Sequence, residues 1–180
     1  MIRSILLTLA VSLSTGVLLW QPAPAYAQVR FLEEEAHKGS PVAQNKLGRM
    51  YLFGKGVPKD PQEAAKWFRK SAHQGFARSE YDLGLLYTQG RGVPKNEQEA
   101  IKWFLKAAKK GYTKAQHKLG DLYREGVGVP KDDIQAYKWY NLAAAQGDDQ
   151  SAAARKRLAR HMTPDQIAQA QKISVKFTQN

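Results

Sequence analysis

The stretch from Ala77 to Tyr112, ARSEYDLGLLYTQGRGVPKNEQEAIKWFLKAAKKGY, recurs in this chain with a period of 36 residues. The same pattern occupies residues 41–76 and 113–148. Each copy keeps a Leu-Gly pair, a Tyr, a Gly-x-Gly-Val-Pro-Lys loop, a Trp, an Ala and a Gly in the same phase. A fixed period of this length indicates a repeat protein, in which each unit packs mainly on its neighbours.

Each copy is predicted to form two antiparallel helices. In the middle copy, Leu83 and Tyr87 have helical spacing in a first helix over about residues 78–88, and Gly90 ends it. The second helix begins at Asn96, whose side chain can accept a bond from the N–H of Glu99, while Glu99 can reach back as in a capping box. The same start signal recurs as Asp60 with Glu63 and Asp132 with Gln135.

Each first helix contains a glycine, at positions 48, 84 and 120. Gly in a helix interior destabilises the helix by up to about 1 kcal/mol relative to Ala. A bulky ring is therefore predicted to pack over the bare backbone, and the Trp of the same repeat is the expected ring. These tryptophans share one phase, which favours the core over ligand stacking: Trp67, Trp103 and Trp139.

The first 27 residues have the features of a secretory signal peptide. Arg3 precedes an apolar run that ends at Trp20, and Ala25–Ala27 offers a small-residue cleavage motif. The alternative is an uncleaved membrane anchor; cleavage is favoured because the small-residue motif follows at once. The chain has no Cys, which excludes disulfides and a lipid-modified cysteine.

The ends of the array are predicted to cap it. Residues 28–40 match the second half of a repeat and form a half-repeat or cap helix. Residues 149–180 form a degenerate C-terminal repeat and a capping helix, which starts with a capping box from Thr163 to Gln166.

The pattern resembles the Sel-one-like repeat family, which is related to tetratricopeptide repeats. The residues that carry the resemblance run from Ala43 to Gly75: Ala-x3-Leu-Gly-x2-Tyr-x2-Gly-x-Gly-Val-x2-Asp-x3-Ala-x2-Trp-Phe-x3-Ala-x2-Gly. Ser71 and Ser79 replace alanines of this pattern. The resemblance covers about residues 29–177. It implies an all-α, right-handed α/α superhelical solenoid of antiparallel helix pairs, and a role as adaptor or binding scaffold.

The formal net charge is +12, and cleavage would lower it by one. An excess of Lys and Arg favours anionic partners. Export argues against nucleic acid as a partner, so none is predicted. The alternative is a basic surface that only keeps the protein soluble.

No catalytic, metal or cofactor site is predicted. The histidines lack the spacing of metal ligands: His37, His73, His117 and His161. The candidate serines lack a strand-turn-helix elbow: Ser71, Ser79 and Ser151. A hydrolase acting on envelope material is the least favoured interpretation.

By analogy with tetratricopeptide grooves, the non-signature positions of the first helices are predicted to line a concave groove. They are Val42, Asn45, Arg49 and Leu52; Arg78, Tyr81, Leu85 and Thr88; and Lys114, His117, Asp121 and Arg124. The basic members can hold carboxylates or a chain terminus, and the apolar members can accept apolar side chains. The predicted ligand is a peptide or protein; the alternative is an idle surface.

Lysines also recur in the loops and on the second helices: Lys59, Lys66, Lys95, Lys102, Lys131 and Lys138. A solvated convex face is the simpler interpretation. The alternative is a surface that docks on an anionic lipid or polysaccharide. The sequence therefore predicts a non-enzymatic periplasmic or secreted scaffold without a membrane span after cleavage, or else an envelope or host-facing factor that binds an anionic polymer.

Overall fold

The structure is a computed structural model that describes residues 25–178 of the 180-residue chain. This part forms nine helices and no strand. They are α1 (Ala25–His37), α2 (Pro41–Phe53), α3 (Pro61–His73), α4 (Ala77–Gln89), α5 (Glu97–Lys109), α6 (Thr113–Glu125), α7 (Asp133–Ala144), α8 (Asp149–Ala159) and α9 (Pro164–Thr178). The predicted signal peptide lies outside the described residues, except for Ala25–Ala27, which begin α1.

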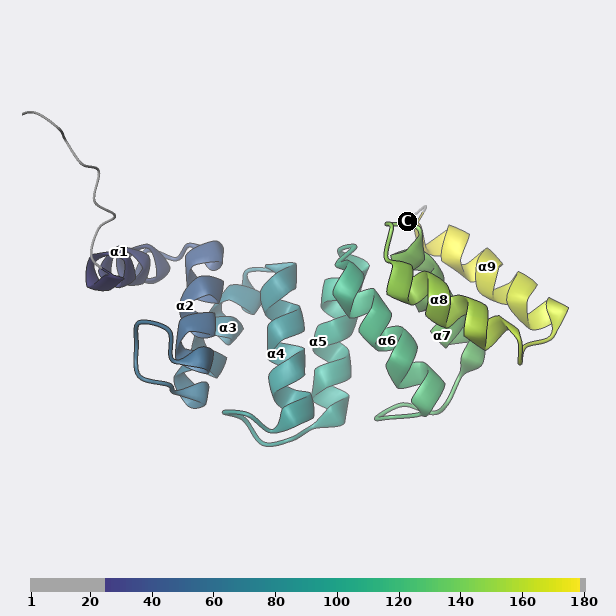
Figure 1. Ribbon diagram of the computed structural model, residues 1–180, viewed down its shortest axis with the longest axis horizontal. Helices are drawn as coiled ribbons and strands as arrows, with labels where there is room; N and C mark the ends of the chain where they lie inside the picture. The colour runs from purple at the N-terminus through teal and green to yellow at the C-terminus, as the bar shows by residue number, and fades with distance from the viewer. Residues whose placement is uncertain (1–24, 179–180) are drawn as a thin grey trace, which may run out of the picture.

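The helices follow one another along the long axis in chain order, from α1 at one end to α8 and α9 at the other (Figure 1). Within the three copies, α2 pairs with α3, α4 with α5 and α6 with α7. Successive pairs contact each other through α3 with α4 and α5 with α6. The predicted all-helical solenoid with a 36-residue repeat is thus confirmed.

The predicted start of each second helix is confirmed at the N-cap side chain. Oδ1 of the cap residue accepts the backbone N–H three residues on, at 2.9, 3.0 and 2.9 Å for Asp60, Asn96 and Asp132. The predicted return bond is replaced, because the carboxylates of Glu63 and Glu99 pair with lysines on the same helix. The N–H of each cap is donated instead to a carbonyl of the first helix, that of Tyr51, Tyr87 or Tyr123, at 2.9–3.0 Å. These bonds close the loop between the two helices.

The ring over each helix glycine is not the predicted Trp. A Cβ built on Gly84 would lie 2.6 Å from Cε1 of Phe104, the residue after Trp103. The same relation joins Gly48 to Phe68 and Gly120 to Tyr140. Adjacent helical residues point about 100° apart, so the Phe faces its own first helix. Trp103 instead packs with core residues of the preceding copy and lies 5.7 Å from the ring of His73.

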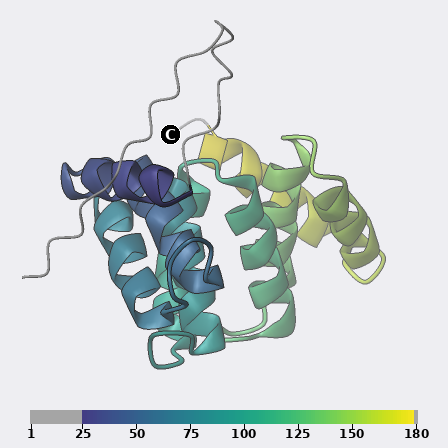
Figure 2. The ribbon, with the colours of Figure 1, turned by 60° about the vertical axis from the view of Figure 1, so that its left-hand side comes forward.

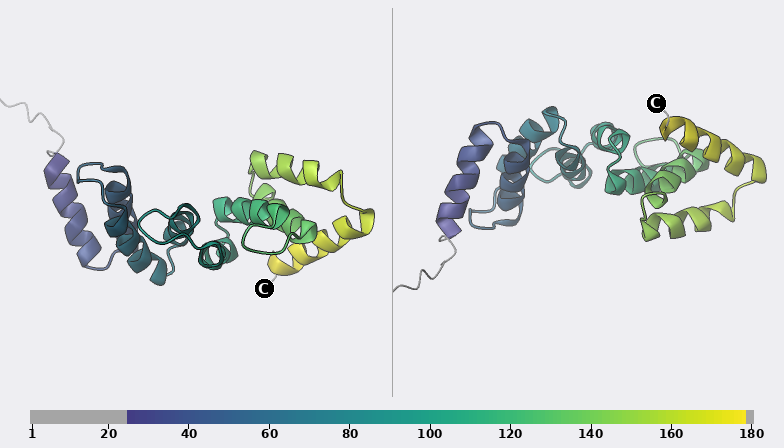
Figure 3. Two further views of the ribbon diagram at one scale, coloured as in Figure 1. Left: turned by 90° about the horizontal axis from the view of Figure 1, so that it is seen from below. Right: turned by 90° about the horizontal axis from the view of Figure 1, so that it is seen from above.

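Helices α8 and α9 form the C-terminal end of the described residues, and their role as a cap stays a prediction. Figure 3 shows α8 and α9 on opposite sides of α7, and α7 contacts both helices. The ring of Phe177 packs edge-on against Trp139 at 5.2 Å, and Ala170 and Ser174 are buried.

At the other end, α1 lies across the direction of the following helices (Figure 2). Phe31 occupies the repeat phase of Trp67. It is 65% exposed, whereas Trp67 is 5% exposed because it packs with Ala36 of α1 and Leu47 of α2. None of the helices in residues 25–178 has the length and apolar character to cross a membrane.

Candidate functional site

The first helices enclose two hollows, and the predicted groove residues divide between them. A hollow of about 280 Å³, the α2/α4 hollow, is lined by six of these residues: Arg49, Leu52, Arg78, Tyr81, Leu85 and Lys114. A larger hollow of about 820 Å³, the α6/α8 hollow, is lined by His117, Asp121 and Arg124. The predicted groove is therefore two hollows whose linings differ.

Three predicted groove residues line neither hollow: Val42, which is 46% exposed, Asn45 and Thr88. Asn45 is 3% exposed, and its Nδ2 donates to Oγ of Ser79 and to Oδ2 of Asp82, both at 2.9 Å. The side chain predicted to face a ligand is thus buried in the junction between α2 and α4. The hydroxyl of Thr88 donates to the carbonyl of Leu85 at 2.8 Å, within its own helix.

The α2/α4 hollow has an apolar floor. Leu52, Phe68 and Leu86 are buried beneath it. Tyr81 forms part of the wall, and its ring packs on Phe104 at 5.6 Å and on Tyr112 at 5.3 Å. All three rings belong to the second copy, in which Tyr112 is the last residue and the N-cap of α6, so the wall is held in place by the core.

Basic side chains outnumber acidic ones around this hollow: Arg49, Arg78, Arg91 and Lys114 against Asp82. Nη1 of Arg49 lies 4.0 Å from Oδ2 of Asp82. Burial raises the pKa of Asp82, and this effect outweighs the hydrogen bond from Asn45 and the positive charges of Arg49, Arg78 and Lys114, which lower it. The single carboxylate therefore compensates little of the positive charge.

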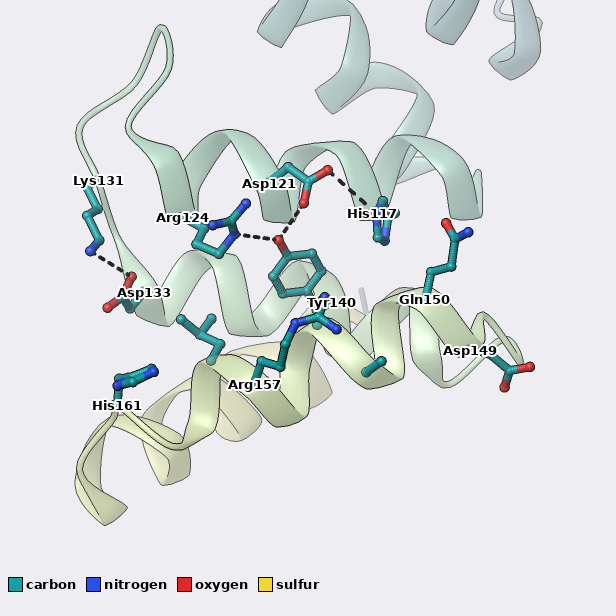
Figure 4. Close-up of a pocket in the computed structure, with 13 residues that line it drawn as sticks. His117, Asp121, Arg124, Lys131, Asp133, Tyr140, Asp149, Gln150, Arg157 and His161 are labelled. Carbon is teal, nitrogen blue, oxygen red and sulfur yellow. Dashed lines mark hydrogen bonds and ion pairs between the residues drawn. The ribbon is translucent and has the colours of Figure 1, made fainter.

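The α6/α8 hollow has a polar wall whose groups bind one another (Figure 4). The hydroxyl of Tyr140 donates to Oδ1 of Asp121 at 2.7 Å, and Nε of Arg124 donates to that hydroxyl at 3.3 Å. Burial and the bond to Asp121 raise the pKa of Tyr140. Nε2 of His117 lies 3.6 Å from Oδ2 of Asp121.

The fold brings Ser151 to His117, a contact that the sequence did not predict. Nδ1 of His117 is 2.7 Å from Oγ of Ser151 and 3.5 Å from a carboxylate oxygen of Asp148, the N-cap of α8. A Ser, a His and an Asp thus lie together, but Ser151 and Asp148 approach the same ring nitrogen, whereas the serine and the carboxylate of a hydrolase triad bind opposite nitrogens. Ser151 is also 0% exposed. The hydrogen bond joins α6 to α8.

Most lysines of the predicted anionic-surface rows have partners. The shortest ion pairs join Lys66 to Glu63 at 2.8 Å and Lys102 to Glu99 at 2.5 Å. Lys95 and Lys131 pair with Glu97 and Asp133 at 3.2 and 3.9 Å. Binding of an anionic surface by these rows stays a prediction, and the acidic neighbours reduce the charge available for it.

Lys138 differs from the other members of its row. Its Nζ lies 4.1 Å from the centre of the Trp139 ring and 5.2 Å from that of Phe177, and burial lowers its pKa. In the first two copies, a lysine three residues after the Trp covers the ring instead, as Lys70 and Lys106 do at 4.3 and 4.0 Å.

Sequence reasoning missed several residues of the α2/α4 hollow. Phe53 lines it and is 52% exposed, and Asp82, Gln89, Arg91 and Tyr112 line it as well. The spacing of four residues from Arg49 to Phe53 was a usable signal for a shared helix face. In residues 25–178, no group of three His, Asp or Glu side chains is arranged to hold a metal ion.

Helix pairs stacked in a row, with a recessed surface along their first helices, define an α/α repeat protein of the tetratricopeptide type. The Sel1 repeat model matches residues 41–76, 77–112 and 113–148. The chain belongs to the Sel1 repeat family. Proteins with these repeats are commonly protein–protein interaction scaffolds.

Solved structures of related proteins support this assignment. A protective antigen of uropathogenic Escherichia coli with an SLR fold is 43% identical, with a TM-score of 0.67; the match covers 68% of this chain and 26% of the antigen. The chain thus spans about a quarter of the length of that relative. A Sel1 repeat protein from Oxalobacter formigenes is 38% identical, with a TM-score of 0.67, and the match covers 72% of this chain and 98% of that protein.

Cysteine rich protein B from Helicobacter pylori shares the fold at 18% identity, with a TM-score of 0.60 and coverage of 74% of this chain and 98% of that one. No curated protein matches the sequence.

Proposed function

We propose that this chain is an exported, non-enzymatic adaptor that holds a protein partner against the surface formed by α2, α4, α6 and α8. One observation carries the proposal: both hollows lie between first helices, and they are lined at the positions where the three copies differ in residue type. Scaffolds of this family commonly use protein partners.

The differences between copies are large in chemical terms. The position of Arg49 is Leu85 in the second copy and Asp121 in the third, although the flanking signature residues are retained. Packing of the repeat therefore does not demand one residue type at this position. A side chain that the fold leaves free is available for recognition of a ligand.

Export is supported by the sequence alone. The basic start, the apolar run and the small-residue motif of residues 1–27 are typical of a signal peptide. The expected location is the periplasm or the extracellular medium, and sequencing the N-terminus of the protein purified from its native cell envelope tests cleavage after Ala27.

Site-specific photo-cross-linking tests the binding surface. A photoreactive amino acid replaces Gln89, which lines the α2/α4 hollow, or Gln98, which lies exposed on the second helix α5 as a matched control. The full chain is expressed in its native cells, and extract of their envelope is irradiated at low and at moderate salt. We expect one protein to cross-link at Gln89 and not at Gln98 at both salt concentrations.

Cross-linking of that protein only at Gln98, or equally at both positions, would contradict the assignment to the first helices. Cross-linking of many acidic molecules that disappears at moderate salt would instead favour the lysine rows, because exposed charges are screened over about 8 Å at physiological ionic strength.

A further inference from the structure

We propose that the α2/α4 hollow takes a large apolar side chain of the partner, and that Asp or Glu residues flank this side chain in the partner's sequence. The proposal rests on the proposed function and names the chemistry of the partner segment: an acidic peptide with one aromatic or large aliphatic anchor.

The size of the hollow fits one side chain. Its volume is about 280 Å³, at the lower limit of the 300–1,000 Å³ that is typical of small-molecule sites. Its floor is formed by buried Leu52, Phe68 and Leu86, and Leu85 adds an apolar wall. An apolar group that packs against this floor loses its contact with water, which favours binding.

The rim of the hollow already exposes an aromatic ring. Phe53 is 52% exposed, one of four large hydrophobic side chains in the described residues with comparable exposure. The guanidinium of Arg49 lies 5.9 Å from the centre of this ring. An anchor side chain in the hollow would cover Phe53 and place its flanking residues next to Arg49.

The charges around the hollow select the flanking residues. Arg78 and Lys114 are exposed and form no ion pair or side-chain hydrogen bond within residues 25–178. On the second helices, by contrast, Lys66 and Lys102 are each paired with a glutamate. Unpaired basic side chains at a recessed apolar site favour carboxylates of a ligand, which can form charge-assisted hydrogen bonds with them.

The α6/α8 hollow lacks this combination. Its three basic residues are matched in number by three acidic ones: Arg124, Lys131 and Arg157 against Asp121, Asp133 and Asp149. The hydroxyl of Tyr140 and the carboxylate of Asp121 also bind each other there. The acidic segment is therefore assigned to the α2/α4 hollow.

The experiment starts with the full chain and a displayed library of random peptides. We expect the enriched peptides to share one aromatic or large aliphatic residue with Asp or Glu on both sides. A fluorescently labelled copy of the most enriched peptide is then titrated with the protein, and anisotropy measures its affinity.

The variants Arg78→Glu and Lys114→Glu are each expected to lower the affinity for this peptide by about tenfold or more, because each replaces a charge-assisted hydrogen bond with repulsion. Lys172 is exposed on α9, away from the hollow. Lys172→Glu makes the same change of charge and is expected to leave the affinity unchanged. Circular dichroism and thermal unfolding verify that all three variants stay folded.

A second pair of variants tests the apolar part. Phe53→Ser is expected to weaken the peptide, whereas Val175→Ser, which removes an apolar side chain of similar exposure from α9, is not. This inference would be overturned if no peptide is enriched or if the enriched peptides lack acidic residues. It would also be overturned if Arg78→Glu leaves the affinity of the enriched peptides unchanged. The proposed function would survive those outcomes if a protein partner still cross-links at Gln89, and would fall only without that cross-link.

Discussion

Glu80 in α4 is 2% exposed, and one of its carboxylate oxygens accepts a hydrogen bond from the ammonium group of Lys110 at the end of α5. The same ammonium group donates to the carbonyl of Gly75 at 2.8 Å. In the other copies these two positions hold a pair of glutamines joined at 2.7 Å, Gln44 with Gln74 and Gln116 with Gln146. The second copy thus exchanges two neutral partners for two charged ones.

We expect Lys110→Ala to destabilise the fold by about 2–3 kcal/mol, because the buried carboxylate of Glu80 loses its counter-charge. Breaking a fully buried pair costs about 3–5 kcal/mol; Lys110 is 41% exposed, so water can replace part of the interaction. The free energy of unfolding from urea titrations gives the measurement.

The double variant Glu80→Gln with Lys110→Gln serves as its control. It rebuilds the pairing of the first and third copies, in which the amide of Gln44 also donates to the carbonyl of Ala36 at 3.0 Å. We expect it to be clearly more stable than Lys110→Ala. A double variant as unstable as Lys110→Ala would show that a Gln–Gln pair cannot replace the Glu80–Lys110 pair in the second copy.

Ser71 and Ser79, the two departures from the alanines of the repeat, form one hydrogen-bonded chain. Ser79 donates to Oγ of Ser71 at 2.7 Å, and Ser71 donates to the carbonyl of Pro41 at 2.7 Å. Both serines are 0% exposed. The pair ties the second copy to the start of the first.

Ser71→Ala leaves the buried hydroxyl of Ser79 without its acceptor, which we expect to cost about 1–3 kcal/mol. Adding Ser79→Ala to it removes the stranded group, so the double variant should cost less than the two single variants together. Thermal unfolding of the four proteins gives the coupling. Strict additivity would mean that the two hydroxyls do not depend on each other.

Gly84→Ala is expected to destabilise the protein by about 1–3 kcal/mol, the usual cost of overpacking a core, although Ala favours a helix by up to about 1 kcal/mol over Gly. The new methyl would meet the buried ring of Phe104. Combining it with Phe104→Leu removes the ring and should restore part of the loss. If Gly84→Ala alone raises the melting temperature, the ring has room to move and the glycine is not required by packing.

The sequence was sufficient for the features that depend on local order and on the period. The helix pairs and the N-caps at Asp60, Asn96 and Asp132 follow from neighbouring residues. The core role of Trp103 follows from its phase, and its exposed fraction is 8%. The 36-residue period shows that equivalent residues have similar surroundings. For the N-caps and for Trp103, the residue type also indicated what those surroundings are, a helix start or the core.

The period could not show which neighbour an aromatic ring faces. Trp103 and Phe104 are adjacent and keep equally strict phases, but only the packing of one copy on the preceding one separates their roles. The prediction that Asn45 faces a ligand was wrong for a similar reason, because its hydrogen-bond partners lie 34 and 37 residues away in the next copy. Nine of the twelve predicted groove residues line the two hollows, and their role in binding stays a prediction.

Asp82 connects stability and recognition in the α2/α4 hollow. Because burial raises its pKa above the ordinary value of 3.8, the folded protein binds this proton more tightly than the unfolded chain does. The charged carboxylate thus costs stability at neutral pH, and that cost disappears as the pH falls through the folded pKa toward 3.8. Asp82→Asn keeps the shape and an acceptor for the amide of Asn45, and we expect it to be more stable than the parent at pH 7.

The advantage of Asp82→Asn should shrink on acidification, which urea titrations between about pH 7 and pH 3 can measure. Asp148→Asn is the control with the opposite sign. Burial raises the pKa of Asp148, but bonds from Ser151 and the nearby His117 outweigh this effect and lower it overall. Its charge therefore adds stability above 3.8 that is lost as the pH falls through the lowered pKa. An advantage of Asp82→Asn that grows on acidification would contradict the assigned cost of its charge.

The same Asp82→Asn variant should bind an acidic peptide more tightly, because it removes the one carboxylate that lines the α2/α4 hollow and leaves Arg49, Arg78 and Lys114 in place. A gain in affinity is hard to obtain from a damaged fold, so this variant complements Arg78→Glu, which predicts a loss. The gain should be largest at low salt, since the charges at the rim are exposed and screened by ions. Weaker binding by Asp82→Asn would mean that Asp82 contacts the ligand as an acceptor and that the segment it binds carries a donor rather than a carboxylate at this point.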